Sequence, residues 1–230
     1  MDKINKVKII VIILIVAFFF NEGISQTPKS EDVAIILKTK GDVKVKKEEE
    51  QKWFKGTRGI RLDSGDIVKT YEKSLAAIMF TDDKSLLKVR DNAALAIRGK
   101  RLKTTMTKRI VCSMGNFWLK VTQQKSKVLV ETPSGIAAVK GTEFYGVVDE
   151  NGNTMIIVIE GIVQLINKLG EALVEAGQTG IMSKGLPPKV FKTDSSQKMK
   201  WADEDKITKE LEFEFQDGNG NKKYLKIIYH

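Results

Sequence analysis

The 230-residue sequence contains a single cysteine, Cys112, and a single histidine, His230, which ends the chain. One cysteine excludes a disulfide within the chain. One terminal histidine argues against a Ser-His-Asp triad and against a histidine-based metal site. Cys112 follows Ile110 and Val111, so we expect a buried small hydrophobe and not a reactive thiol. The sequence predicts no catalytic residue, no metal and no cofactor.

The sequence also lacks a long hydrophobic run near its start. The apolar segment Ile9–Phe20 is shorter than the ~20 residues that a membrane-spanning helix needs. Three lysines precede this segment, and Gly23-Ile24-Ser25 follows it. This order is typical of a secretory signal peptide cleaved after Ser25. We therefore expect an exported protein, periplasmic or secreted, with membrane attachment only if the segment stays uncleaved as an anchor.

Charge is abundant and unevenly placed. The formal net charge is +10, and one acid-free segment carries six cations: Arg98, Lys100, Arg101, Lys103, Lys108 and Arg109. One interpretation is a solvated loop or hairpin tip. The other is a contact with an anionic surface such as a phosphorylated lipid or wall polymer. No aromatic residue interleaves these cations, so the segment does not predict nucleic-acid binding.

From Val33 onward, short apolar runs alternate with Gly, Asp, Asn and Ser. Val43 and Val45 alternate with lysines, which is the period of a half-buried strand. Similar units begin at Gly41, Gly115 and Gly161, and related corners contain Gly65 and Gly177. The pattern predicts an all-β fold, an antiparallel β-sandwich or irregular β-roll of about a dozen short strands.

The predicted organisation has five parts. These are a signal peptide (1–25), a linker (26–32), a β domain (33–186), a second linker (187–200) and a C-terminal appendage (201–230). In the appendage, Leu211–Phe215 and Tyr224–Tyr229 flank the turn residues Asp217–Gly220, which predicts a β-hairpin. Asp203–Leu211 is a weaker candidate for a short helix because it is heavily charged.

Three motifs in the middle of the chain occur in a defined order: Thr132-Pro133-x-Gly135, Val139-x-Gly141-Thr142-x-Phe144 and Val158-x-Glu160-Gly161-x-Val163. Earlier stretches, Gly41-Asp42-Val43 and Leu62-x-x-Gly65-Asp66-x-Val68, fit the same scheme. Together they resemble the FecR-type domains of bacterial envelopes, over Val33 to Ser183. By this resemblance, Thr132, Pro133, Gly135, Gly141, Thr142, Phe144, Glu160 and Gly161 are structural or contact residues.

The resemblance implies a non-enzymatic role in the envelope. In the founding family the domain lies behind a membrane anchor and relays receptor occupancy to a sigma factor. Here the part before the apolar segment, Met1–Lys8, is too short to be a sigma-binding domain. We therefore predict a binding or scaffolding module for an envelope protein or surface polymer. The alternative is an anchored sensor that passes a signal through a partner.

Enzymatic alternatives rest on weaker patterns. A wall-polysaccharide enzyme would use carboxylates drawn from Glu131, Glu143 and Glu160. The family motif instead suggests that Glu160 accepts backbone hydrogen bonds at its corner. Ser134 and Lys140 form a conceivable Ser–Lys pair, although Ser134 fits a turn position better.

Two further patterns bear on binding. Asp82 and Asp83 lack a third oxygen ligand, so they indicate turn chemistry and not a metal site. Phe117 and Trp118 must point to opposite faces of a strand. Trp118 is therefore a candidate aromatic contact if its face is exposed.

Overall fold

The computed structural model of the chain describes residues 32–50, 52–102, 105–122 and 128–194, and the backbone of 210–216 and 222–228. The predicted signal peptide lies outside the described residues. So does the predicted helix up to Lys209, while Glu210 and Leu211 belong to a strand. Among the described residues, no helix has the length and apolar character needed to span a bilayer.

The first half of the main body contains nine strands. They are β1 (Ala34–Lys40), β2 (Val43–Lys46), β3 (Trp53–Lys55), β4 (Arg61–Leu62), β5 (Ile67–Thr70), β6 (Leu75–Phe80), β7 (Leu86–Val89), β8 (Ala94–Leu102) and β9 (Thr105–Lys120). The second half continues with β10 (Val128–Thr132), β11 (Gly135–Val139), β12 (Glu143–Val148), β13 (Thr154–Glu160), β14 (Ile162–Asn167), β15 (Gly170–Glu175), β16 (Gln178–Met182) and β17 (Lys189–Lys192).

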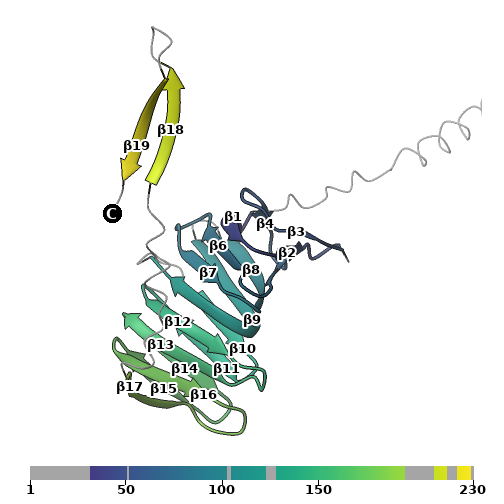
Figure 1. Ribbon diagram of the computed structural model, residues 1–230. Coiled ribbons are helices and arrows are strands. Elements are labelled where there is room, and N and C mark those ends of the chain that lie inside the picture. The colour runs from purple at the N-terminus through teal and green to yellow at the C-terminus, as the bar shows by residue number, and fades with distance from the viewer. Residues whose placement is uncertain are drawn as a thin grey trace, which may run out of the picture. The chain divides into compact units, whose positions relative to one another are not determined.

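These 17 strands form one continuous hydrogen-bonded system (Figure 1). It consists of two sheets that share the long strand β9. Sheet A has the order β4-β1-β6-β7-β9-β12-β13-β16-β17. Sheet B has the order β3-β2-β5-β8-β9-β10-β11-β14-β15. All of these pairs are antiparallel except β9–β10, which is parallel. The predicted all-β class is confirmed, with more strands than expected.

Strand β9 changes sheet in its middle. Its residues Lys108–Val111 pair with β10 in sheet B, and Gly115–Lys120 pair with β12 in sheet A. The change occurs at Gly115, whose φ is 116°. A β-carbon there would lie 2.2 Å from the Cβ of Ala93. Only glycine fits both the backbone angle and the space.

Other glycines mark further transfers of the chain between the sheets. Gly41 and Gly161 each lead from sheet A into sheet B, with φ values of 73° and 82°. Gly141 and Gly177 lead back from sheet B to sheet A, with φ values of 61° and 81°. The units predicted to begin at Gly41 and Gly161 therefore each start where the chain passes from sheet A into sheet B.

The hydrophobic core lies between the two sheets. Residues along the strands alternate between buried and partly exposed, as in β6 and β12. Phe117 of β9 and Phe144 of β12 pack edge to face, with ring centroids 6.1 Å apart. A β-carbon at Gly180 of sheet A would lie 2.5 Å from side-chain atoms of Leu165 and Val174 in sheet B. The facing layers are thus in direct contact.

The predicted C-terminal hairpin is present. Strand β18 (Glu210–Gln216) pairs with β19 (Lys222–Ile228) in antiparallel register. The register sets Glu212 opposite Lys226.

Candidate binding site

A pocket opens on the molecule where β9 separates from β10. The β9–β10 ladder ends at the pair Val111–Glu131, and the β9–β12 ladder begins at Gly115–Val148. Between these two points Cys112 and Ser113 form one wall of a cavity of about 850 Å³. This volume is within the range of ligand pockets, ~300–1,000 Å³. The change of sheet by β9 therefore creates the site.

The floor of the pocket is the turn between β10 and β11, Thr132–Gly135. Its hydroxyl groups form a directed chain of hydrogen bonds. Ser134 Oγ donates to Thr154 Oγ1 at 2.7 Å, which donates to Thr132 Oγ1 at 2.7 Å, which donates to the Gly135 carbonyl at 3.1 Å. Thr154 is fully buried and Ser134 is buried. The turn is therefore held rigidly and its hydroxyl protons are already committed.

Gly135 of β11 allows the backbone of β14 to approach closely beside the pocket. A β-carbon at Gly135 would lie 2.5 Å from the Ile166 carbonyl oxygen of the neighbouring strand β14. Ile136 and Ile166, cross-strand partners on β11 and β14, form an apolar surface beside this contact. Both are only partly buried. The pocket thus has an apolar wall on sheet B.

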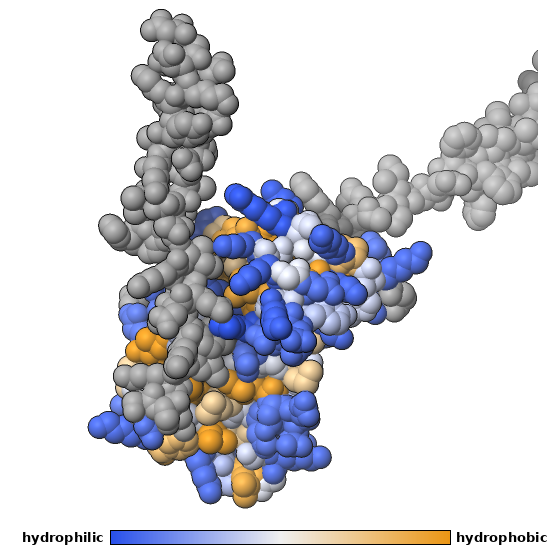
Figure 2. All heavy atoms as spheres, viewed as in Figure 1, coloured by the Kyte–Doolittle hydropathy of each residue, from blue (hydrophilic) through white to orange (hydrophobic). Residues whose placement is uncertain are grey.

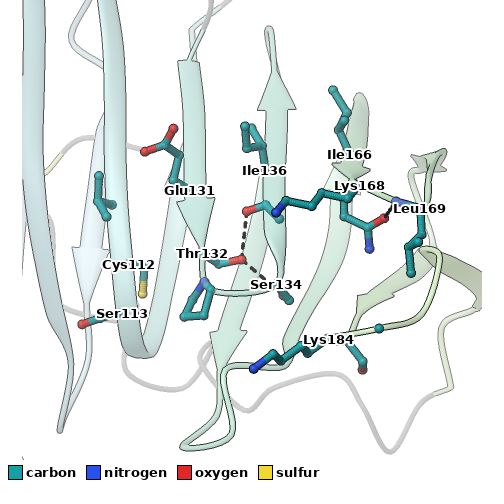
Figure 3. A pocket seen from close by; sticks show the side chains of 16 residues that line it. Cys112, Ser113, Glu131, Thr132, Ser134, Ile136, Ile166, Lys168, Leu169 and Lys184 are labelled. Carbon is teal, nitrogen blue, oxygen red and sulfur yellow. Dashed lines mark hydrogen bonds between the residues drawn. The ribbon is translucent and has the colours of Figure 1, made fainter.

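The opposite wall comes from two loops. Lys168 and Leu169 lie in the β14–β15 turn, and Lys184 lies between β16 and β17. Asn167 joins the loops, because its side-chain amide donates to the Leu186 carbonyl at 2.8 Å while its oxygen accepts from the Leu169 N–H at 2.9 Å. Figure 3 shows both lysine side chains extending toward the β10–β11 turn. Leu169 is 56% exposed.

The pocket has a positive electrostatic balance. Its one acidic lining residue, Glu131, forms an ion pair with Arg109 of β9. Lys168 and Lys184 are exposed, and among the described residues neither lysine forms an ion pair with an acid. An anionic group in the pocket would therefore meet two cations beside an apolar wall.

Cys112 lines the pocket without being chemically available. Its side chain is fully buried, as predicted. Burial raises the pKa of the thiol to about 12. The thiol donates a weak hydrogen bond to the Met114 carbonyl. At neutral pH the thiol is protonated, so it lacks the thiolate that nucleophilic chemistry requires.

The family-motif residues divide into two groups. Thr132, Pro133 and Gly135 come together in the pocket. Gly161 instead packs on the corner before β12, where a β-carbon would lie 2.7 Å from the Gly141 carbonyl oxygen and 2.8 Å from Thr142. Phe144 is fully buried in the core. The second group, which comprises Gly141, Thr142, Phe144 and Gly161, therefore lies where the chain crosses between the sheets, from β11 to β12 and from β13 to β14.

Glu160 does not have the expected hydrogen bonds. Its side chain is exposed, and none of the described residues donates a backbone hydrogen bond to its carboxylate. It lies opposite Glu143 in the β12–β13 register, and its charge contributes to a raised pKa of Lys120. The main cause of that raised pKa is the hydrogen bond of Lys120 with Glu143, at 2.8 Å. Glu160 is therefore a surface charge.

The candidate catalytic groups do not converge. Glu131 lies on sheet B beside Arg109, whereas Glu143 and Glu160 lie on sheet A. Ser134 is buried with its hydroxyl donating to Thr154, and Lys140 is exposed after the end of β11. Asp82 and Asp83 do not form a metal site either, because their carboxylates face the ammonium of Lys108.

The structure corrects the predicted placement of Lys108. Its side chain is fully buried, with Nζ 3.1 Å from Asp82 Oδ1 and in an ion pair with Asp83. The ammonium also lies 5.1 Å from the centre of the Phe80 ring. Lys108 therefore connects β9 with the β6–β7 turn and cannot contact an external anionic surface. Asp82 and Asp83 are distant from Lys108 in sequence, so the absence of acids near Lys108 wrongly indicated that its side chain is exposed to solvent or to an anionic surface.

The rest of the basic segment is consistent with a hairpin tip. β8 and β9 pair up to Leu102–Thr105, and Arg98, Lys100 and Arg109 are exposed. The side chains of Arg101 and Lys103 lie outside the described residues. A contact of these remaining cations with an anionic surface stays a prediction.

The predicted aromatic contact at Trp118 is wrong. Trp118 is only 6% exposed, and its Nε1 donates to Glu143 Oε1 at 3.2 Å. The ammonium of Lys88 lies 4.6 Å from the ring centre. Phe117, on the opposite face of β9, is fully buried. Neither ring is available to a ligand.

Sequence reasoning missed the loop residues that complete the pocket, Lys168, Leu169 and Lys184. Leu169 and Lys184 directly precede Gly170 and Gly185, and Lys168 lies two residues before Gly170, so the sequence indicated turns at both places. Nothing local shows that the two turns meet, because the Asn167–Leu186 hydrogen bond joins loops that follow strands of different sheets, β14 in sheet B and β16 in sheet A.

Comparison with known protein families finds a match within the main body. Residues 66–164 match the family model described as FecR protein. The chain therefore contains a FecR domain, which confirms the family indicated by the motifs. The match begins and ends inside the predicted domain 33–186, and those outer boundaries stay predictions.

Two solved structures resemble the chain. Both are described as crystal structures of a candidate anti-sigma factor from Parabacteroides distasonis ATCC 8503, at 1.65 and 2.50 Å resolution. The first is 12% identical, with a TM-score of 0.49, and the match covers 67% of this chain and 70% of that one. The second is 11% identical, with a TM-score of 0.51 and coverages of 64% and 66%. The second match, at this low identity, shows a shared fold alone. A search of curated proteins found no match.

Proposed function

We propose that this chain is a non-enzymatic component of the bacterial cell envelope that relays a signal by binding a protein partner. The FecR domain at residues 66–164 carries this proposal. The fold shared with a candidate anti-sigma factor supports the same direction. Both observations favour the anchored sensor, which was the alternative hypothesis from the sequence, over the free binding or scaffolding module.

The site supports binding and not turnover. The pocket offers an apolar wall, two cations and a rigid turn, whereas Ser134, Cys112 and the three candidate glutamates lack the arrangement of an acid, a base and a nucleophile. Export of the domain rests on the cationic and apolar N-terminal sequence. An envelope location would bring the domain to surface proteins, while the signal itself would pass through the partner.

Two measurements test the proposal. N-terminal sequencing of the protein recovered from cell envelopes should find the chain uncleaved; a start at Gln26 would remove the anchored form. Deletion of the gene should change the transcript levels of a defined gene set, and the wild-type gene should restore them. Unchanged transcripts in the deletion strain would contradict a relay and leave the free scaffolding module as the better interpretation.

A further inference from the structure

The pocket includes a short open strand edge. On one side, Cys112 and Met114 of β9 pair with Leu95 and Ala94 of β8. On the other side, β10 has ended its pairing and β12 has not yet begun. No strand among the described residues pairs with Cys112–Met114 on that side. The register of β9 against β8 shifts at Ser113, so the unpaired backbone is a bulged edge of three residues, to which only a short stretch of an extended peptide could add.

An apolar wall faces this edge. Ile136 and Ile166 lie on the outer surface of sheet B, and Leu169 projects from the β14–β15 turn. Leu186, in the adjoining loop, is 50% exposed. Figure 2 shows hydrophobic residues on the outside of this half of the molecule. Exposed apolar side chains gathered around a pocket are typical of a protein contact.

The two cations add selectivity for charge. Lys168 and Lys184 enter from the same two loops that carry the exposed leucines. Glu131 is already paired with Arg109, so it does not neutralise them. Successive side chains of an extended peptide point to opposite sides. One set could pack on the apolar wall while the other reaches the lysines.

We infer that this pocket binds an extended segment of a protein partner in which acidic and apolar residues alternate. The inference rests on the proposed function and gives the chemistry of the partner. An acidic polysaccharide would satisfy the lysines but would leave the apolar wall and the strand edge without matching groups. The observations therefore favour a peptide over a polymer.

Fluorescence anisotropy of the full-length chain with a short labelled peptide of alternating Glu and Leu residues tests this inference. We expect saturable binding. The double variant K168E/K184E should weaken binding by about tenfold or more at low salt, because two attractive pairs become repulsive. Leu169→Ser should weaken it about threefold through lost apolar contact.

The matched control is K189E/K192E, which makes the same change of charge at two exposed residues of β17 that do not line the pocket. It should leave affinity unchanged beyond a small effect of net charge, and all variants should keep the wild-type melting temperature. Absence of peptide binding, or equal weakening by the control pair, would overturn the inference.

Binding of an acidic polysaccharide distinguishes a peptide ligand from a polymer ligand. If polygalacturonate binds as tightly as the peptide and Leu169→Ser has no effect on either, the pocket is an anion site and the inference is wrong. The transcript measurement is independent of this result. An intact relay together with absent peptide binding would mean that the partner uses another surface.

Discussion

At the scale of single residues, the fully buried ammonium of Lys108 has the largest predicted effect on stability. Lys108→Met would leave the carboxylates of Asp82 and Asp83 without their cation in the interior. Removing one partner of a buried ion pair typically costs ~3–5 kcal/mol. We expect a loss of this size in the free energy of unfolding measured with urea. Arg109→Met, a change at an exposed cation in the same strand, should cost less than about 1 kcal/mol. Equal losses would contradict the interpretation.

The same cluster predicts an acid-sensitive fold. Burial alone raises the pKa of Asp83, but the Lys108 ammonium and hydrogen bonds from Ser85 outweigh it, so the pKa lies below its ordinary value. A carboxyl whose pKa is lower in the folded state stabilises the fold above its unfolded pKa of ~3.9. That stability is lost as pH falls through the folded value.

We therefore expect the urea-derived stability to fall below about pH 4 through this group. The double variant Asp83→Asn with Lys108→Met should show a smaller decline over the same range. A decline as steep as that of the wild-type protein would show that other carboxyls control acid unfolding.

At the scale of elements, β9 holds the two sheets together, and Gly115 allows it to do so. Gly115→Ala would force a β-carbon to within 2.2 Å of Ala93 Cβ in addition to an unfavourable φ of 116°. Gly177→Ala isolates the second effect, because its φ is 81° and its surroundings are open. We expect a loss of about 1 kcal/mol for Gly177→Ala and at least about 2 kcal/mol more for Gly115→Ala. Urea unfolding of both variants measures the difference. Similar losses would mean that β9 can shift to accommodate the side chain.

At the scale of the whole molecule, local patterns predicted the all-β class, the glycine corners and the C-terminal hairpin. Each depends on neighbours in sequence: alternation at Val43 and Val45, glycine between apolar runs, and the turn Asp217–Gly220. The FecR motifs added the family and three pocket residues, Thr132, Pro133 and Gly135.

Long-range pairing lay beyond such patterns. The burial of Lys108 depends on a turn of the other sheet, and the pocket depends on the point at which β9 leaves β10. Trp118 is buried together with Phe117 and Leu119 on either side of it, because Lys88 and Glu143 from neighbouring strands contact its ring. The chemistry of a side chain was predictable from the sequence, whereas its exposure depended on which strands became neighbours.

Cooperativity between the two sheets leads to a final prediction, which uses the thiol of Cys112 as a reporter. The thiol is fully buried and its pKa is about 12, so labelling by a maleimide at pH 8 requires an opening that exposes it. Because β9 belongs to both sheets, freeing Cys112 should require unfolding of the whole main body. Lys108→Met should then increase the labelling rate by the factor that corresponds to its loss in the free energy of unfolding. For a loss of ~3 kcal/mol measured with urea, this factor is at least about a hundredfold. If the variant labels at the wild-type rate, Cys112 is exposed by local opening of the pocket wall, and the two sheets do not unfold as one unit.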